Sequence, residues 1–397
     1  MLNIGDSQNK TVAVVTGTRA EFGLLRPVID ELTKAMMSVR LLVTGTHLAD
    51  AFGKTISEIK AGGYSVEKEF DILFNDAETP MDKAFARAFS LFFEYFSSNP
   101  PDIVVLLGDR YETLAAALAA GMSNLPVAHI GGGDVTEGAK DDCFRHCVTK
   151  LSRLHFPSTE RCRRRIIQLG EAPERVFNVG SLGAENMTKL PVMSKRELSH
   201  CLGFDFDRDY LLVTYHPETL GGVHPLKGLN EMLFALDAVG LSVLFTKANA
   251  DDEGAAINRR LAEYCEGRDG CRLFDSLGAE RYMSALRYAK AVVGNSSSAV
   301  VEAPVLRVPA VDIGGRQKGR ETGVNVINCK EDRVSIERAV RKAVSDEFRE
   351  SIKDMQSPYG GVDVSKNIAS EIFEFLQNDS GGLRKQFYDV CFKTDGE

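Results

Sequence analysis

The 397-residue sequence lacks features that mark whole classes of protein. It has no Trp, which excludes nothing, but it also has no apolar run near the roughly 20 residues that cross a bilayer. Its start, Met1–Lys10, lacks the basic and apolar segments of a secretory signal. The net charge is −8 and no long basic block is present, as nucleic-acid binding would require. We therefore expect a cytoplasmic protein with neither a membrane nor a nucleic-acid partner.

The cysteines also lack a recognisable pattern, because the eight of them are scattered without a CxxC pair. Cys143 and Cys147 stand four positions apart around His146 and could share one face of a helix. A second cluster of metal ligands, which a metal site would need, is not visible in the sequence. We expect no metal and reduced structural thiols, as is usual in the cytoplasm.

What the sequence does contain is an ordinary globular composition, with 44% hydrophobic and 26% charged residues. This excludes a largely disordered chain. The length exceeds the size at which a single hydrophobic core usually stops growing, so two domains are expected.

Short apolar runs alternate with segments of helical spacing along most of the chain. Such strands, apolar throughout and separated by helices, are typical of parallel sheets covered on both faces. The sequence predicts two doubly wound α/β domains, over residues 1–190 and 191–378, with 379–397 a candidate to return to the first. The predicted strands are 12–16, 39–44, 103–107, 127–130 and 154–156, then 211–215, 243–246, 273–274, 291–293 and 310–313.

Doubly wound domains bind ligands outside the carboxyl ends of their strands, so the residues directly after each strand are the candidates. After the first strand, the small residues of 16–23 would let the backbone approach a phosphate, and Arg19 would add a cation near a helix N-terminus. An ordinary glycine turn would look similar. After the run 103–107, Asp109 and Arg110 are well placed for a site, although Asp109 could instead cap the next helix.

The segment 129–142 combines three consecutive glycines with four carboxylates. The glycines would let a ligand lie close to the backbone, and the carboxylates could handle protons. A solvated acidic loop is the alternative, but it does not explain why the neighbouring strand also ends in Asp and Arg. The carboxylates are Asp134, Glu137, Asp141 and Asp142.

The second half offers polar groups suited to a nucleotide diphosphate. His216 follows a strand and could bind phosphate or transfer protons. The turn after Gly294 presents hydroxyls and backbone N–H groups, and Glu302, one helical turn on, could take a ribose diol. The loop 314–323 carries Arg316 and Arg320, suited to gripping a diphosphate. The turn consists of Asn295, Ser296, Ser297 and Ser298.

Nine motifs of the sequence, in chain order from about residue 12 to 330, resemble those of the hydrolysing UDP-N-acetylglucosamine 2-epimerase family. The enzymes of this family make N-acetylmannosamine for sialic acid, and the resemblance extends to their relatives in legionaminic acid synthesis. The resemblance implies a GT-B-like fold of two Rossmann-like domains facing a central cleft, and a homo-oligomer, dimer or tetramer. It implies no cofactor and no metal. The motifs are TGTRAEFG, GDRYE, GGGDVTEGAKDDCFRH, TKLSRLHFPSTE, IIQLGE, NVGSLGAEN, YHPETL, GNSSSAVVEAP and GGRQKGRETG.

The resemblance also implies a two-stage reaction. UDP leaves C1 as the proton leaves C2, giving a 2-acetamidoglucal; water then adds at C1 and a proton returns to the opposite face of C2. Departure of the diphosphate gives C1 cationic character and makes the C2 proton removable, so a carboxylate can serve as base. Inversion needs at least two acid/base groups, one of them kept protonated by burial or a like charge.

Residue by residue, Asp109 and Asp141 match the family's acid/base positions, and His216 matches the histidine near the phosphates. Many family members have Glu or His where this chain has Gly131, which leaves Asp134 as the better candidate for the second catalytic group. Asn249 and Asp251 match a segment that closes on the ligand. Nucleotide and diphosphate positions are matched by Arg19, Ser297, Ser298, Glu302, Arg316 and Arg320, to which we add Arg110, Asn295 and Ser296 from the same motifs.

We expect the substrate to be UDP-N-acetylglucosamine or a 2,4-diacetamido relative. A glycosyltransferase of the same fold, a non-hydrolysing 2-epimerase and a non-catalytic nucleotide-sugar sensor are the alternatives. The sequence does not distinguish uridine from guanosine.

Overall fold

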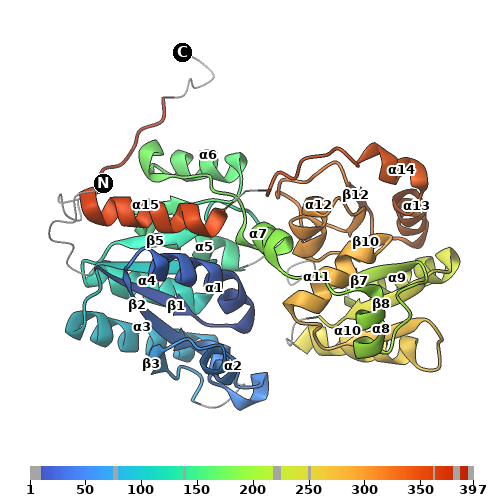
Figure 1. The fold of residues 1–397 in the computed structure, drawn as a ribbon, viewed down its shortest axis with the longest axis horizontal. Coiled ribbons are helices and arrows are strands. Elements are labelled where there is room, and N and C mark those ends of the chain that lie inside the picture. The colour runs from blue at the N-terminus through green and yellow to red at the C-terminus, as the bar shows by residue number, and fades with distance from the viewer. Residues whose placement is uncertain are drawn as a thin grey trace. The chain divides into compact units, whose positions relative to one another are not determined.

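The structure is a computed structural model that describes residues 10–74, 79–136, 140–217, 225–248, 252–360, 363–378 and 385–391. The chain folds into two compact units (Figure 1). Unit 1 holds the described residues up to 134, from 140 to 182 and from 363 onward. Unit 2 holds residues 135–136 and the described residues of 183–360. The last helix, drawn in red in Figure 1, therefore belongs to unit 1.

Unit 1 is a six-stranded parallel sheet with the order β3-β2-β1-β4-β5-β6, covered by helices. Its strands are β1 (Thr11–Thr16), β2 (Ser38–Thr44), β3 (Val66–Phe70), β4 (Ile103–Leu107), β5 (Val127–Ile130) and β6 (Leu154–Phe156). Its helices include α1 (Arg19–Lys34), α2 (Ile56–Ala61), α3 (Met81–Ser98), α4 (Tyr111–Met122), α5 (Lys140–Leu151), α6 (Glu160–Gln168) and α15 (Val364–Asn378).

Alternation along β1 explains why both faces of this sheet are covered. Val12 and Val14 join the core beneath α1 and α15, whereas Ala13 and Val15 join the opposite core beneath α3 and α4. Successive side chains of a strand point to opposite faces, so an unbroken apolar run needs helices on both sides. The α1 helix begins with a capping box, in which Thr18 accepts from the Glu21 amide.

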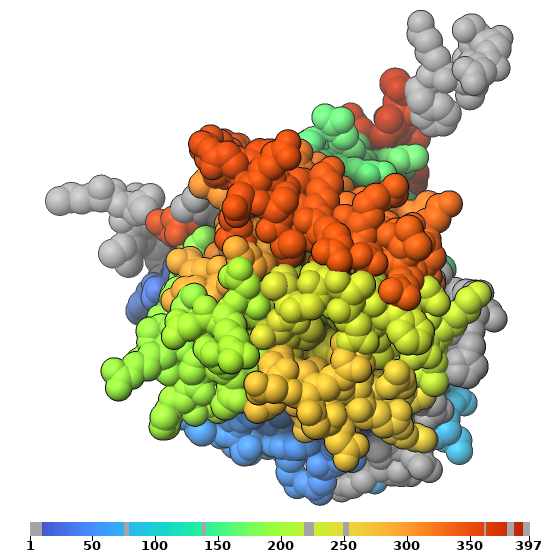
Figure 2. All heavy atoms as spheres, turned by 90° about the vertical axis from the view of Figure 1, so that its right-hand side faces the viewer, coloured from blue at the N-terminus to red at the C-terminus, as the bar shows by residue number. Residues whose placement is uncertain are grey.

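Unit 2 repeats this architecture with the strand order β12-β11-β10-β7-β8-β9. The helix α13 packs against α9, and Figure 2 shows the orange-red part of the chain beside the yellow-green part. The strands are β7 (Tyr210–Thr214), β8 (Ser242–Thr246), β9 (Cys271–Phe274), β10 (Ala291–Gly294), β11 (Ala310–Ile313) and β12 (Val326–Cys329). The helices include α8 (Lys195–Leu202), α9 (Pro225–Val239), α10 (Asp252–Cys265), α11 (Ala279–Tyr288), α12 (Glu302–Val305), α13 (Arg333–Ala343) and α14 (Asp346–Ser351); α7 (Leu182–Lys189) connects the units in sequence.

The predicted fold class is confirmed, because both sheets are parallel and doubly wound. Two edge strands, β3 and β12, escaped the sequence prediction. β3 exposes Glu67, Lys68 and Glu69, and charged edge strands lack the apolar pattern on which the prediction relied. After β10 the chain forms a 3-10 turn, η4 (Ser297–Ala299), which is followed by the single helical turn of α12.

Both strand orders reverse direction beside the first strand of the unit, between β1 and β4 in unit 1 and between β7 and β10 in unit 2. In open α/β sheets this reversal leaves a crevice outside the carboxyl ends, where ligands bind. The residues that follow these four strands are therefore the first to consider in each unit.

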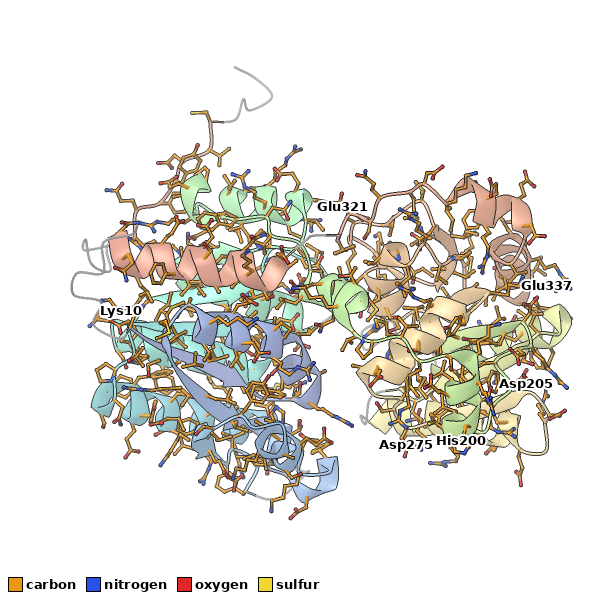
Figure 3. All side chains as sticks on the ribbon, in the orientation of Figure 1. Lys10, His200, Asp205, Asp275, Glu321 and Glu337 are labelled. Carbon is orange, nitrogen blue, oxygen red and sulfur yellow. A yellow bond between two sulfur atoms is a disulfide. The ribbon has the colours of Figure 1, made fainter. Side chains whose placement is uncertain are left out.

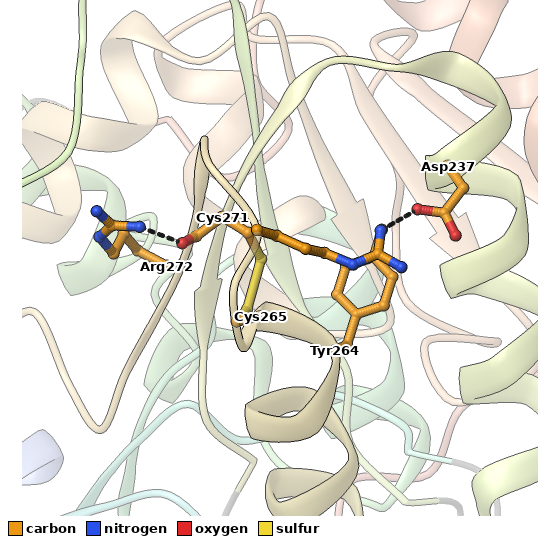
Figure 4. Close-up of a disulfide and its surroundings, with 6 residues drawn as sticks. Asp237, Tyr264, Cys265, Cys271 and Arg272 are labelled. Carbon is orange, nitrogen blue, oxygen red and sulfur yellow. Dashed lines mark hydrogen bonds and ion pairs between the residues drawn. A yellow bond between two sulfur atoms is a disulfide. The ribbon is translucent and has the colours of Figure 1, made fainter.

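Cys265 and Cys271 form a disulfide between the end of α10 and the start of β9 (Figure 4). Within the closed loop, the Arg268 guanidinium lies 3.9 Å from the centre of the Tyr264 ring and 2.5 Å from Asp237. The expectation of reduced thiols is thus wrong for this pair, whose partners the scattered spacing did not reveal. Among the described helices, none is long and apolar enough to cross a membrane.

Candidate functional site

In unit 1, polar side chains gather where β4 and β5 end. Asp109 and Arg110 follow β4, the glycine run and Asp134 follow β5, and these two strands are neighbours in parallel register. The first turns of α5 add further charged residues beside them. Neighbouring parallel strands place their carboxyl ends at one edge, which explains why segments far apart in sequence meet here.

Arg145, on α5, organises this edge. Its Nη2 forms an ion pair with Oδ2 of Asp109, and its Nη1 lies 2.9 Å from Oδ1 of Asp142 and donates to the carbonyl oxygen of Asp134, also at 2.9 Å. The Arg145 side chain is only 4% exposed, against 27% for Asp109. A nearly buried guanidinium therefore fixes the position of the Asp109 carboxylate. Asp109 does not cap α4, whose N-cap residue is Arg110.

Asp141 completes the acidic group. Partial desolvation and then the negative charge of Asp109 raise the pKa of Asp141, while Arg110 and Arg145 oppose the shift. The two carboxylates therefore sit in different environments, one paired with a guanidinium and the other inclined to keep its proton. A base beside an acid is what a reaction that removes and returns a proton requires.

Close packing requires two of the three glycines after β5, Gly132 and Gly133. Cβ atoms would lie 2.8 Å from the Thr149 hydroxyl at Gly132 and 2.3 Å from the Cys162 carbonyl oxygen at Gly133. Gly131 differs, because its φ is +83° but the nearest atom to a Cβ would be the Gly108 amide nitrogen at 4.0 Å. The position where many family members carry an acid thus has room for a side chain, although its left-handed backbone favours glycine.

His129 belongs to the support of this edge. It is fully buried, with Nε2 2.8 Å from the Gly108 carbonyl oxygen and Nδ1 3.1 Å from the Thr149 hydroxyl. Burial lowers the pKa of His129 to about 3, so the ring is neutral at neutral pH. It ties the end of β4 to α5 and is not an acid/base group.

Two arginines predicted to bind phosphate lie near the end of β1. Arg19 is exposed and pairs with Glu58 at 2.9 Å, a weak surface interaction that a ligand could replace. Arg110 is held more firmly, since its Nε lies 2.5 Å from Oε1 of Glu112.

In unit 2, Asn295 joins the ends of β7 and β10. Its Oδ1 accepts from the backbone N–H of His216 at 2.7 Å, and its Nδ2 donates to the His216 carbonyl oxygen at 2.8 Å. Asn295 is fully buried. The preceding Gly294 has φ +136°, and a Cβ there would lie 1.9 Å from the Thr214 carbonyl oxygen. The ends of β7 and β10 are therefore packed closely against each other.

The turn after Gly294 is fixed by its own hydroxyls. Ser296 accepts a hydrogen bond from the Ser298 amide at 3.4 Å, and the hydroxyls of Ser298 and Tyr282 are hydrogen-bonded. Such a turn directs successive amides to one side, the arrangement that binds anions.

The loop after β11 packs onto this turn. Arg316 and Gln317 both donate to the Asn295 carbonyl oxygen, at 3.0 and 2.7 Å. Burial and then the Arg316 charge lower the pKa of His216 to about 4. A neutral His216 beside Arg316 is a hydrogen-bonding group for an anion, not a second cation.

Two carboxylates of unit 2 have oxygens that suit a ligand hydroxyl. Burial raises the pKa of Glu302, against the opposing charge of Arg320. One buried oxygen of Glu302 and one of Glu321, labelled in Figure 3, lack a hydrogen-bond partner among the residues described here. Buried acceptors without partners are costly unless a ligand supplies a donor.

Unit 1 thus brings together three predicted residues, Asp109, Asp134 and Asp141, around Arg145, which was not among them. In unit 2 the residues that meet are His216, Asn295, the serine turn and Arg316.

Asn249 and Asp251 lie outside the described residues. Arg145, Glu21 and Glu112 were missed, although Arg145 stands one helical turn after Asp141 and so shares its face. Within the described ranges no cluster of three or more His, Cys, Asp or Glu side chains could hold a metal ion.

Known proteins share much of this sequence. The family model described as UDP-N-acetylglucosamine 2-epimerase matches residues 30–373. The chain is 38% identical to the GDP/UDP-N,N'-diacetylbacillosamine 2-epimerase (hydrolyzing) of Campylobacter jejuni, over 86% of this chain and 89% of that protein. It is 35% identical to the polysialic acid biosynthesis protein P7 of Escherichia coli, over 96% and 98%.

A solved structure supports the fold. The UDP-GlcNAc 2-epimerase of Neisseria meningitidis, bound to UDP-GlcNAc, superposes with a TM-score of 0.76 at 18% identity, over 93% of this chain and all of that chain. The architecture is thus that of a two-domain α/β enzyme of the 2-epimerase type. The chain belongs to the UDP-N-acetylglucosamine 2-epimerase family.

Proposed function

We propose that this chain is a hydrolysing 2-epimerase, which converts UDP-N-acetylglucosamine or a 2,4-diacetamido relative to the free 2-epimer and a nucleoside diphosphate. Family membership supports the reaction class, and the named activity of the Campylobacter jejuni relative supports the diacetamido substrate. The observation that carries the proposal is the acidic group of unit 1, in which Arg145 pairs with Asp109 and the pKa of the neighbouring Asp141 is raised.

The acidic group would carry out both proton transfers. Asp109, which pairs with Arg145, removes the C2 proton as the diphosphate leaves C1. Asp141, with its raised pKa, is suited to return a proton to the opposite face of the intermediate. Asp134 lies on the same loop as Gly131 and supplies a carboxylate where that position has none.

Unit 2 would hold the nucleotide and stabilise the leaving group. The amides and hydroxyls of residues 295–298, with Arg316 and Arg320, suit a diphosphate that gains charge as its bond to C1 breaks. Glu302 suits a ribose diol. We propose that the enzyme is a cytoplasmic homo-oligomer, a dimer or tetramer, which light scattering would test.

Product analysis with a panel of UDP- and GDP-linked 2-acetamido and 2,4-diacetamido sugars tests the reaction class and the substrate together. We expect one substrate to yield free 2-epimeric sugar and nucleoside diphosphate in equal amounts. A nucleotide-linked epimer as the stable product would identify a non-hydrolysing epimerase. Transfer to an added acceptor would identify a glycosyltransferase, and binding without any turnover a sensor.

A further inference from the structure

Two carboxylates flank the guanidinium of Arg110 at the reversal of strand order in unit 1. Oε1 of Glu112 lies 2.5 Å from Nε of Arg110, and Oε1 of Glu21 lies 3.8 Å from the same nitrogen. The Glu112 and Glu21 side chains are only 2% and 12% exposed. Glu21 follows β1, whereas Arg110 and Glu112 follow β4. The three residues thus bridge the two strands between which a ligand is expected.

The surrounding backbone is shaped to admit these carboxylates. A Cβ on Gly17 would lie 2.8 Å from Oε1 of Glu112, and one on Gly45 would lie 3.3 Å from it. Oε2 of Glu21 accepts hydrogen bonds from the amides of Gly17 and Thr18, at 2.7 and 3.2 Å. Oε2 of Glu112 is buried and has no hydrogen-bond partner in the described part of the chain. A buried ionised carboxylate with an unsatisfied oxygen is costly, and a shared proton relieves that cost.

The charges of the three side chains also favour a bound proton. One guanidinium cannot neutralise two buried carboxylates, so the pair favours keeping one proton between them. Burial, and then the charge of Glu112, raise the pKa of Glu21 to about 7, although Arg110 and the two amides oppose the shift. Titration near neutral pH is therefore expected at this pair.

Other titratable groups face the pair. Tyr111 has a pKa raised to about 12 by burial and by Glu112, and His47, held through the Thr18 backbone, has a pKa lowered to about 4 by burial. Neither changes its charge between pH 6 and 8.5. Asp141 is a third such group, since the Glu112 charge contributes to its raised pKa.

We propose that Glu21 and Glu112 are positioning residues that share one proton around Arg110, and that an anionic nucleotide-diphosphate sugar binds to the form in which this proton is present. The inference rests on the proposed function for its ligand class. When the proton is present, the net charge of the three side chains is zero. When it is absent, their net charge is −1, which repels an anionic ligand. Only Nε of Arg110 is used by the pair, and neither Nη group has a hydrogen-bond acceptor among the described residues, so both can reach a ligand.

Binding of an inert substrate analogue tests the proposal without turnover. The probes are methylene-linked phosphonate analogues of UDP- and GDP-N-acetylglucosamine, which cannot release the nucleotide and do not titrate between pH 6 and 8.5. Calorimetry in two buffers of different ionisation enthalpy measures protons taken up on binding. We expect Kd to rise about tenfold per pH unit above pH 7, as linkage to one proton requires, with uptake of a fraction of a proton at pH 7 that approaches one at pH 8.

Variants separate a shared proton from a merely structural role. Glu21→Gln and Glu112→Gln should each make Kd nearly independent of pH in this range, with binding at pH 8 stronger than that of the unaltered protein. Asp141→Asn should keep the slope. The proposal would be overturned if the unaltered protein took up no proton on binding, and this test holds even if a variant fails to fold. It would also be overturned if both Gln variants bound the analogue more weakly by the same factor at every pH. If neither analogue binds, the proposed ligand class fails and the inference fails with it.

Discussion

Arg145 reaches from α5 to Asp109 at the end of β4 and forms a nearly buried ion pair with its carboxylate. The two residues lie 36 positions apart in sequence, and Arg145 also holds Asp142 and the backbone of Asp134. This single side chain therefore determines the position of the proposed base relative to the other carboxylates.

Replacing the proposed base should abolish chemistry while sparing ligand binding. Asp109→Asn keeps the shape of the side chain but cannot accept a proton, so we expect kcat to fall by about 10²- to 10⁴-fold, the usual contribution of a general base. Steady-state kinetics and binding of an inert analogue give the two quantities. Asp205→Asn is the matched control, because Asp205 is exposed on unit 2 (Figure 3) and pairs only with surface residues. A variant that keeps more than a tenth of kcat would exclude Asp109 as the base.

Weakening the partner of the base should shift the pH dependence of activity. Arg145→Lys keeps a positive charge but loses the fork that joins Asp109 to Asp142. Because hydrogen bonds to a carboxylate favour its ionised form, we expect their loss to move the acidic limb of the kcat/KM profile to higher pH. Arg145→Met should in addition lower the free energy of unfolding by about 3 to 5 kcal/mol, because it leaves a buried carboxylate unpaired. An unshifted acidic limb in the Lys variant would contradict the assignment.

The glycine run should respond unequally to alanine. Gly131→Ala places a Cβ in open space but requires a left-handed backbone, which costs about 1 kcal/mol. Gly133→Ala has the same backbone cost and also drives the Cβ against the Cys162 carbonyl oxygen, 2.3 Å away, so we expect a loss of more than about 3 kcal/mol. Denaturant unfolding of both variants makes the comparison. Equal losses would show that the packing around Gly133 does not distinguish the two positions.

A buried carboxylate outside the acidic group, that of Glu171, should control acid stability. Burial alone would raise the pKa of Glu171, but hydrogen bonds from His155, Lys150 and Lys385 lower it to about 2. The folded-state pKa lies below the ordinary value of 4.5, so the stabilisation is present above pH 4.5 and is lost as the pH falls toward 2. The loss should amount to about 3 kcal/mol.

Glu171→Gln tests this prediction. The variant should be less stable than the unaltered protein at pH 7 and should approach it in stability as the pH falls. A difference that stays constant from pH 7 to pH 3 would show that Glu171 does not titrate with folding. The same variant should loosen Lys385, whose Nζ pairs with Glu171 and donates to the backbone of Lys150 and Ser152.

The fold was largely predictable because buried parallel strands leave apolar runs such as 103–107 that few other structures produce. The two unpredicted strands lie at sheet edges, where one side of the strand has no partner and charged residues are tolerated, as in Val66–Phe70. The disulfide between Cys265 and Cys271 was not predictable either, since a spacing of six positions permits a bridge without requiring one.

The site was predictable where sequence position alone decides proximity. Asp109 follows its strand directly, so its place at the edge of the sheet could be inferred. Arg145 and Glu21 act through their side chains on residues of other segments, and their partners become known only when the chain is folded. The role of Gly131 could be read only in part, because the sequence shows a missing acid but not the open space and the left-handed backbone at that position.

Turnover in deuterated water tests the central claim most directly. Removal of the C2 proton by Asp109, followed by return of a solvent-derived proton to the other face, predicts free 2-epimeric sugar with one deuterium at C2, seen by mass spectrometry and by loss of the C2 proton signal. The Asp109→Asn variant should form almost none of this product. Free epimer without deuterium at C2 would contradict the account.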